Sequence, residues 1–268
     1  MPQAVGFFTD TSVCIGCKAC QVACRQWNDS PDTATGFELP VLSGDSYDNT
    51  GSFSDVNWRH VKFIEQFSED RAQAAWLMMS DVCKHCADAP CMDVCPTNAI
   101  LRTEFDTVYI NEPACNGCRD CIAACPFGVI HISPSKDVAQ KCTFCYDRLK
   151  GGLTPACAQA CPTESIQFGA LKELQQKAAA RVGQLRDAGQ TGARLYGADD
   201  NILGGLNSFY LLLDEPEVYG LPTNPQVPSH SVPRSSLWSI LTAIVTALGI
   251  LFAFRERTSD EPTPNPEP

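Results

Sequence analysis

The chain has 268 residues, enough for one or two domains, and 16 of them are cysteines, well above ordinary usage. Its formal net charge of −11 argues against nucleic-acid binding, which requires a basic surface. An acidic protein of this kind is better suited to docking on a protein partner.

From the N-terminus, the first predicted element is a short strand at residues 5–8, before the first of four cysteine runs. Residues 25–57 are rich in Asp, Ser, Gly, Pro and Thr, which predicts an irregular segment. Alternating side chains at 58–67 and an apolar end to 71–80 predict two strands, the second a core strand leading into the second cysteine run. We therefore expect residues 25–75 to form a surface insertion.

The residues between the second and third cysteine runs predict a β-hairpin, because Ile100-Leu101 and Val108–Ile110 flank a polar turn. The third run reads C-x₂-C-x₂-C-x₃-C-P and ends in Cys125. This is the ligand run of bacterial ferredoxins, in which three thiolates hold one [4Fe–4S] cluster and the fourth holds its neighbour. Two runs joined by a hairpin predict a two-cluster ferredoxin-like unit, here the inner unit, over residues 80–132.

The other three runs are variants of the same pattern, and every run ends in the step x₃-Cys. The first run lacks the final proline, the second has two extra residues in its middle, and the fourth has a long central gap. Four runs of four ligands predict four [4Fe–4S] clusters with no cysteine left over. The runs are Cys14, Cys17, Cys20 and Cys24; Cys83, Cys86, Cys91 and Cys95; Cys115, Cys118, Cys121 and Cys125; and Cys142, Cys145, Cys157 and Cys161.

The last cysteine of each run is expected to bind the cluster of another run. Runs two and three exchange their last cysteines within the inner unit, and by elimination runs one and four exchange theirs. The outer unit would then combine residues 1–30 with 138–170. In the alternative, run one pairs with two and run three with four. We assign cluster A to Cys14, Cys17, Cys20 and Cys161; cluster B to Cys24, Cys142, Cys145 and Cys157; cluster C to Cys83, Cys86, Cys91 and Cys125; and cluster D to Cys95, Cys115, Cys118 and Cys121.

Three other uses of paired cysteines fit this sequence less well. Disulfides suit a small secreted domain, but residues 1–10 lack the basic start and the long apolar stretch of a signal peptide. Zinc sites close with two pairs of ligands and do not use a third cysteine two residues further on. Covalent haem requires C-x₂-C-H, and no cysteine pair here is followed by histidine.

Short strands are predicted beyond the third and fourth runs, at 129–132 and 165–169, so that each of these ferredoxin halves ends with a strand. Apolar residues near helical spacing predict a helix at 170–184, and residues 209–213 predict a buried strand. Proline, serine and asparagine then mark residues 222–234 as a semi-extended linker.

Residues 235–254 carry no charge, and at about 1.5 Å per residue a helix of this length spans roughly the 30 Å hydrocarbon core of a bilayer. A buried core helix is the alternative, which the position after a proline-rich linker disfavours. Arg255 and Arg257 follow the span and only Arg234 closely precedes it, so the positive-inside rule places the tail, 255–268, in the cytoplasm. The tail is expected to be disordered and the cluster domain to lie outside; a domain facing the cytoplasm is the alternative.

The predicted fold class is α+β: a four-cluster domain of two ferredoxin-like units over residues 1–221, followed by one transmembrane helix. The most informative motifs are Cys14–Cys24, Ser80–Cys86, Cys125–Val129, Lys141–Arg148 and Pro155–Thr163. In these motifs the chain resembles the iron–sulfur β subunit of membrane-bound respiratory formate dehydrogenase, from about Phe7 to Phe254. The four-run pattern is shared with electron-transfer subunits of dimethyl sulfoxide, polysulfide and nitrate reductases, and the terminal helix favours the formate dehydrogenase type.

The resemblance implies two protein partners. In that family, a catalytic α subunit carries a molybdenum or tungsten bis-pterin cofactor, and a membrane γ subunit with b-type haems reduces quinone. The β subunit between them passes electrons through four clusters, with the cysteine pairing given above and on the outer face of the membrane. The alternatives are a subunit of another molybdopterin reductase or hydrogenase, and a membrane-tethered polyferredoxin with several partners.

No catalytic group is predicted in this chain, because its four histidines are isolated in the sequence. His85 lies inside a ligand loop, where a hydrogen bond to a cluster or to the backbone is expected. Four basic residues adjoin ligand cysteines, and each is expected to raise the potential of the nearest cluster, since charge and hydrogen bonds to sulfur set such potentials. The alternative is that they solvate the loops or balance charge. These residues are Lys18, Lys84, Arg119 and Lys141.

Overall fold

The computed structural model describes residues 3–28, 46–48, 50–70, 72 and 74–259. The chain divides by its contacts into two units, residues 1–227 and 228–268. The first unit contains every cysteine and every described strand, and the second contains the C-terminal helix.

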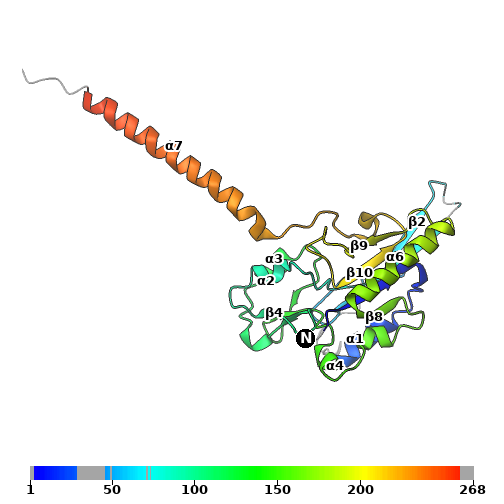
Figure 1. The fold of residues 1–268 in the computed structure, drawn as a ribbon. Helices are drawn as coiled ribbons and strands as arrows, with labels where there is room; N and C mark the ends of the chain where they lie inside the picture. The colour runs from blue at the N-terminus through cyan, green and yellow to red at the C-terminus, as the bar shows by residue number, and fades with distance from the viewer. Residues whose placement is uncertain (1–2, 29–45, 49, 71, 73, 260–268) are drawn as a thin grey trace, which may run out of the picture. The chain divides into compact units, whose positions relative to one another are not determined.

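A four-stranded sheet in the first unit joins segments that are far apart in the sequence (Figure 1). The strand β1 (Val5–Asp10) lies between β10 (Ser208–Leu212), to which it is parallel, and β8 (Ile166–Ala170), to which it is antiparallel. The strand β9 (Arg194–Tyr196) pairs with the other edge of β10. The N-terminus and the segment after the fourth cysteine run are therefore neighbours in one sheet.

The helix α6 (Leu171–Asp187) packs on this sheet through one apolar face. Because the apolar residues recur at helical spacing, they all point to the same side. The buried residues of this face are Leu174, Ala178, Val182 and Leu185. The predicted strands at 5–8, 165–169 and 209–213 and the predicted helix at 170–184 are confirmed, whereas β9 was not predicted.

A long hairpin of β2 (Arg59–Phe67) and β3 (Ala74–Val82) confirms the two strands predicted before the second cysteine run. At its base Arg59 pairs with Val82 and both residues are buried, whereas Phe67 at the far end is exposed. The prediction of a surface insertion over 25–75 is therefore wrong at the base of β2, because pairing with β3 draws it into the core. The predicted core strand is buried only toward its end, since Trp76 is 47% exposed. Residues 29–45 of the predicted insertion lie outside the described residues.

All four cysteine runs share one local arrangement, in which the third cysteine is the second residue of a short helix. In the three runs that end in Cys-Pro, the helix stops before the last cysteine, because proline disfavours helical backbone at and before its own position. In the first run, Arg25 stands where the others have proline, and the helix continues to Trp27. The four helices are α1 (Ala19–Trp27), α2 (Pro90–Asp93), α3 (Asp120–Ala124) and α5 (Ala156–Gln159).

The hairpin predicted between the second and third runs is confirmed as β4 (Ile100–Arg102) and β5 (Val108–Ile110). The strand predicted at 129–132 is shorter, because only β6 (His131–Ile132) pairs, with β7 (Ala139–Gln140). The other short elements of this unit are η1 (Thr11–Val13), η3 (Glu112–Ala114), α4 (Tyr146–Lys150) and η4 (Pro216–Tyr219).

The C-terminal unit consists of η5 (Pro228–Ser231) and α7 (Val232–Ser259), which corrects two predictions. The linker predicted at 222–234 ends in helical structure, because Pro233 in the first turn of α7 is compatible with a helix start. Residues 255–259 of the predicted disordered tail continue the helix, and residues 260–268 lie outside the described residues.

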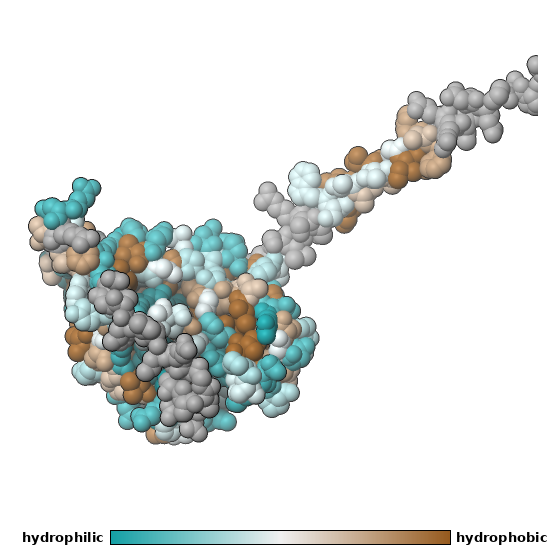
Figure 2. Space-filling model, turned by 180° about the vertical axis from the view of Figure 1, so that it is seen from behind, coloured by the Kyte–Doolittle hydropathy of each residue, from teal (hydrophilic) through white to brown (hydrophobic). Residues whose placement is uncertain are grey.

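Within α7, Leu237–Phe254 is long and apolar enough to cross a membrane, with a mean hydropathy of 2.2 and none of the segment buried. Apolar side chains cover much of its surface (Figure 2). The hydroxyls of Thr242 and Thr246 donate to the carbonyls of Trp238 and Thr242, at 2.7 and 2.8 Å. Their polar atoms are thus satisfied within the helix, as an apolar surrounding requires.

Candidate iron–sulfur sites

Three cavities in the first unit are each lined by four cysteines drawn from two different runs. Each cavity brings together three cysteines of one run and the last cysteine of another, in the grouping expected from the hairpin and by elimination. Set A is Cys14, Cys17, Cys20 and Cys161; set C is Cys83, Cys86, Cys91 and Cys125; and set D is Cys95, Cys115, Cys118 and Cys121.

The remaining four cysteines form a fully buried group, which we name set B: Cys24, Cys142, Cys145 and Cys157. Burial raises the pKa of the Cys24 thiol well above its usual value, and the other three members raise it further by charge repulsion. Burial likewise raises the pKa of Cys145 to about 12, with Cys157 adding to the rise. The four sulfurs of set B therefore lie within electrostatic reach of one another, in the grouping that elimination gave.

The donor chemistry of these sets fits a [4Fe–4S] cluster. All sixteen cysteines are free thiols, and among the described residues no three Cys, His, Asp or Glu side chains are close enough to hold a single metal ion. Each set instead surrounds a space, which suits a group with several metal atoms at separate corners. Burial raises the pKa of Cys121 to about 11, so such a sulfur becomes a thiolate at neutral pH only when a bound cation stabilises it.

The four sets follow one another in the order A, B, C, D. Burial raises the pKa of Cys20 in set A to about 11, and Cys157 of set B contributes to the rise. Burial, and after it Cys83 of set C, raises the pKa of Cys142 in set B. Burial raises the pKa of Cys91 in set C to about 12, and Cys121 of set D contributes. Adjacent sets are therefore close enough for their sulfurs to influence each other.

Solvent exposure differs between the middle and the ends of this row. Every cysteine of set B is buried, as are three of the four in set C. Sets A and D each have one exposed member, Cys17 and Cys118. The middle of the row is thus shielded from water, and each end reaches the protein surface.

The residue before the second cysteine of every run has a left-handed backbone. In runs one and three it is glycine, Gly16 with φ 65° and Gly117 with φ 70°, and a Cβ on Gly117 would meet the carbonyl oxygen of Asp137. In runs two and four it is His85 with φ 46° and Phe144 with φ 59°, whose rings meet edge to face at 4.7 Å between centroids. Left-handed non-glycine residues cost roughly 1–3 kcal/mol each and concentrate at functional loops. One backbone geometry in four different sequences indicates one kind of ligand.

Lys84, one of the four predicted tuning residues, is buried beside set C and paired with a carboxylate. Its ammonium forms an ion pair with Asp81 and donates to the carbonyl of Val82 at 2.8 Å. Asp81 also pairs with Lys62 at 2.9 Å and accepts a hydrogen bond from Tyr210 at 3.0 Å. The positive charge of Lys84 is therefore balanced locally.

Lys141 is equally buried but has no carboxylate partner among the described residues. Its ammonium donates to the carbonyls of Val108 and Cys142, which are neutral acceptors. Lys141 opposes the rise that burial causes in the pKa of Cys91. Lys141 therefore adjoins sets B and C as a buried, unbalanced positive charge.

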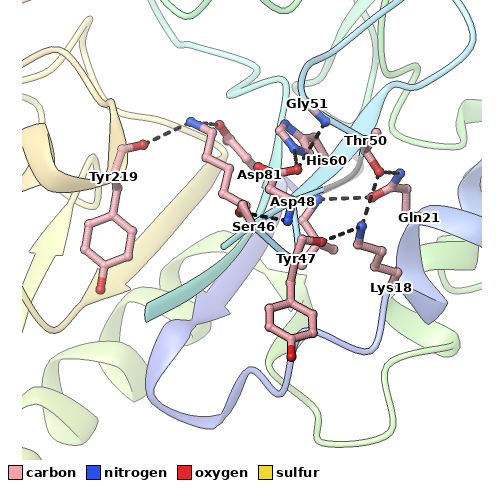
Figure 3. Close-up of polar contacts among 12 residues, drawn as sticks. Lys18, Gln21, Ser46, Tyr47, Asp48, Thr50, Gly51, His60, Asp81 and Tyr219 are labelled. Carbon is pink, nitrogen blue, oxygen red and sulfur yellow. Dashed lines mark hydrogen bonds and ion pairs between the residues drawn. The ribbon is translucent and has the colours of Figure 1, made fainter. Parts of the chain in front are cut away.

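The other two predicted tuning residues lie closer to water. Lys18 is half-buried, and its ammonium donates to the carbonyl of Tyr47 at 3.3 Å and to the hydroxyl of Thr50 at 3.5 Å (Figure 3). Arg119 is exposed in the loop of set D. Solvent screens both charges more strongly than those of Lys84 and Lys141.

His85 makes the hydrogen bond to the backbone that was one of two expected for it. Its Nδ1 accepts from the backbone N–H of Val108 at 3.0 Å, which leaves the ring proton on Nε2. Burial, followed by the charges of Lys141 and Arg102, holds the pKa of His85 well below its usual value. His85 is therefore neutral, and its Nε2–H has no partner among the described residues at the edge of the cavity of set C.

Two buried charges beside the sets were not predicted from the sequence: Arg59 at the base of β2, and Asp81 two residues before Cys83. Asp81 precedes the second cysteine run, and Arg59 faces the start of that run across the hairpin. Neither is next to a ligand cysteine in the sequence, as Lys84 is. No local sequence pattern singles them out, because their burial follows from the pairing of β2 with β3.

Two family models of the 4Fe-4S dicluster domain match the chain, over residues 13–99 and 74–171. The two ranges together contain all sixteen cysteines, and they overlap at residues 74–99. They therefore do not divide the four runs into two separate pairs.

Curated relatives match most of the chain. It is 37% identical to the formate dehydrogenase-O iron–sulfur subunit of Escherichia coli over 246 residues, which is 90% of this chain and 79% of the relative. It is 38% identical to the nitrate-inducible formate dehydrogenase iron–sulfur subunit of the same organism, over 91% of this chain and 80% of the relative. The B subunit of the anaerobic dimethyl sulfoxide reductase of Escherichia coli is 34% identical, over 66% of this chain and 78% of the relative.

Proposed function

Because the protein belongs to the family of formate dehydrogenase iron–sulfur subunits, we propose that it carries electrons from a catalytic molybdopterin subunit to a membrane cytochrome b subunit that reduces quinone. The observation that carries this proposal is the row of four thiol sets, buried in the middle and exposed at both ends. A bound [4Fe–4S] cluster supplies one-electron transfer. The chain itself acts as the non-catalytic subunit of an oxidoreductase complex.

The sixteen cysteines hold four clusters in this proposal, each set contributing its four thiolates to one cluster. The chain buries all four cysteines of set B and three of the four in set C, so that electrons in the middle of the row are shielded from solvent and from small oxidants. At the ends, Cys17 and Cys118 bring sets A and D within reach of partner proteins. Entry and exit of electrons would therefore take place at opposite ends of the row.

Four basic residues were expected to raise cluster reduction potentials, and their burial and charge pairing support this role to different extents. Lys141 is buried and unbalanced, so its field acts on sets B and C with little screening. Lys84 acts together with Asp81, and the two opposite charges largely cancel at a distance. Lys18 and Arg119 are nearer to solvent and act weakly. We therefore assign the main tuning role among the four to Lys141.

The helix α7 anchors the chain in the bilayer in this proposal, through residues 235–254. The arginines at 255 and 257 place the end of the helix in the cytoplasm by the positive-inside rule, and the cluster domain on the outer face. The opposite orientation, with the cluster domain in the cytoplasm, is distinguished by protease protection of residues 1–227 in sealed vesicles of known sidedness.

Formate is the proposed source of electrons because the formate dehydrogenase subunits match the chain over about nine tenths of its length. A thiosulfate reductase electron transfer subunit of Salmonella typhi is 37% identical, but over only 61% of the chain. A partner that reduces thiosulfate or a sulfoxide is therefore the second candidate.

The test is purification of the assembled complex from membranes without oxygen. Co-elution of a large pterin-containing subunit and a b-type haem subunit, with formate-dependent reduction of added quinone, is the expected result. Iron analysis is expected to give about sixteen atoms per chain beyond those of the partners, from four clusters of four irons. Zinc in place of iron, or electron flow from another donor without response to formate, contradicts the proposal.

A further inference from the structure

Among the described residues, Arg59 is the largest fully buried side chain, with only 1% of its surface exposed. It begins β2, and pairing of that strand with β3 places it opposite Val82, next to the first cysteine of the second run. Its guanidinium lies over the ring of Phe7, 5.2 Å from the ring centre. A charged group at this depth requires opposite charge or hydrogen bonds to offset its loss of water.

One end of the guanidinium is linked to set A through a serine. Nη1 of Arg59 donates to the hydroxyl of Ser80 at 3.0 Å, and that hydroxyl lies 3.1 Å from the sulfur of Cys20. Since the hydroxyl oxygen accepts from arginine, its own proton is free to point at Cys20. Arg59, Ser80 and Cys20 thus form a continuous series of polar contacts.

The other two nitrogen positions of Arg59, Nε and Nη2, are buried and have no hydrogen-bond partner among the described residues. Burial lowers the pKa of Arg59, but Cys157, Cys20 and Cys142 together raise it above its ordinary value. These cysteines belong to sets A and B. The Phe7 ring below the guanidinium stacks at 4.1 Å on Phe144, which lies between Cys142 and Cys145 in the sequence, so Arg59 adjoins set B as well as set A.

No carboxylate pairs with Arg59 among the described residues. Its neighbour across the hairpin, Asp81, is already engaged by Lys84, Lys62 and Tyr210. A buried guanidinium left without a counter-charge is strongly unfavourable. The available negative charge is that of the thiolates in sets A and B together with the group they bind.

We propose that Arg59 is shared by the first two clusters, with Nε and Nη2 donating hydrogen bonds to sulfur at sets A and B. Its single positive charge raises the reduction potential of both clusters together, because it stabilises the added electron on either one. Arg59 is thus a positioning and tuning residue that no ligand motif marks. The inference rests on the proposed function, since it requires clusters at sets A and B.

The experiment compares Arg59→Gln and Arg59→Lys in the complete complex. The cluster potentials are measured by redox titration followed by electron paramagnetic resonance, and iron is measured in every sample. For Arg59→Gln, we expect the potentials of two clusters to fall, with at least a tenfold change in the ratio of oxidised to reduced cluster at a fixed ambient potential, or about 59 mV for a one-electron couple. For Arg59→Lys we expect a smaller fall in the same two clusters, because the charge stays and the planar fork is lost.

The matched control is Arg194→Gln, which removes one positive charge from a surface pair with Glu215 and is expected to move no cluster potential. Set D, at the far end of the row, serves as the internal reference.

If the clusters of sets A and B keep their potentials in both Arg59 variants, or if all four potentials move equally, the inference is overturned. If Arg59→Gln loses clusters, the decision rests on Arg59→Lys. A fall in reduction potential that is confined to two clusters of this variant supports the inference, and unchanged potentials overturn it. Wild-type complex without iron at sets A and B would instead overturn the proposed function.

Discussion

The outer region, with sets A and B, and the inner region, with sets C and D, use the same cysteine loops but are held together differently. The inner region is local: the β4–β5 hairpin joins its two runs, and His85 bonds to the backbone of β5. The outer region unites segments more than a hundred residues apart, through β1 and β8. Phe7 stacks on Phe144 at 4.1 Å between centroids, and Trp27 donates to Asp147 at 2.9 Å.

The two regions also differ in how their buried positive charges are balanced. In the inner region, Asp81 neutralises Lys84. Around set B and its borders, Arg59 and Lys141 have no carboxylate partner among the described residues. An unpaired positive charge is therefore retained beside the most deeply buried set, and its effect depends on the neighbours that the fold supplies and not on adjacency to a cysteine.

The largest expected effect comes from removing the last cysteine of a run in each region. In Cys161→Ala, we expect loss of the cluster at set A, although the substituted residue lies in the fourth run. About four of sixteen irons should disappear. Anaerobic alkylation followed by mass spectrometry should then label the other three thiols of the set. These are Cys14, Cys17 and Cys20.

Cys125→Ala is the matched change in the inner region, and it should expose Cys83, Cys86 and Cys91 to the same reagent. Neither loss should open a long loop, because set B still joins runs one and four and set D still joins runs two and three. The two variants should therefore lower the denaturation midpoint by similar amounts. If Cys161→Ala instead exposed Cys115, Cys118 and Cys121, the alternative pairing of runs three and four would be correct.

The next effect in size concerns the balanced charges of the inner region. Asp81→Asn removes the carboxylate that pairs with Lys84 and Lys62 and accepts from Tyr210. Breaking a buried pair leaves an uncompensated charge, so the free energy of unfolding should fall by about 3–5 kcal/mol. Guanidinium titration of the anaerobic protein, followed by circular dichroism, measures the change. Asp70→Asn, in an exposed turn, is the control and should leave the midpoint unchanged.

The pH dependence of this effect has a definite sign. Burial opposes it, but Lys84 and Lys62 hold the pKa of Asp81 far below its usual value. The stabilisation is therefore fully present above the unfolded pKa of about 3.9 and disappears only as pH falls toward the folded pKa. The difference between wild type and Asp81→Asn should stay constant from about pH 5 to pH 8. A difference that vanished near neutral pH would show that Asp81 is not the charged partner of the two lysines.

The cysteine sets could be predicted from the sequence and the buried charges could not, because local geometry places the cysteines and tertiary packing places the charges. The spacing within a run is set by the local geometry of one loop, so it indicated which three cysteines share a cavity, and the hairpin and elimination supplied the fourth. The hairpin between runs two and three was equally local. The burial of Arg59 depends instead on the pairing of β2 with β3, and that of Lys141 on the carbonyl of Val108, 33 residues away. Such contacts come from tertiary packing, and no pattern along the chain contains them.

The two ends of the C-terminal helix α7 were also not predicted correctly from the sequence. Apolar composition predicted the central span, but proline-rich and charged flanking residues predicted a linker and a disordered tail. The helix extends into both flanks, to Val232 and to Ser259, because each added residue gains a hydrogen bond once a helix has formed.

The third effect compares the unpaired charge of Lys141 with the paired charges of Asp81 and Lys84. Lys141→Gln should lower the potential of a neighbouring cluster by roughly 100 mV, the value for a unit charge about 7 Å away at an effective dielectric constant of about 20. Removing both partners of the inner pair, as Asp81→Asn with Lys84→Gln, should move the cluster of set C by less than half as much. Redox titration of the two variants measures both shifts. Equal shifts would mean that Asp81 does not balance Lys84 at the cluster.

The smallest effect is expected at the exposed end of the inner region. Arg119 adjoins Cys118 in the sequence as Lys141 adjoins Cys142, but it is exposed to water. A unit charge about 8 Å away in water contributes roughly 20 mV, and salt screens it further. Arg119→Gln should therefore lower the potential of the cluster at set D by about 20 mV at low salt and by almost nothing at high salt. The shift of Lys141→Gln should persist in both conditions, because a buried charge is not screened by mobile ions. A large shift for Arg119→Gln that resists salt would mean that partner subunits cover this end of the row and bury the arginine in the assembled complex.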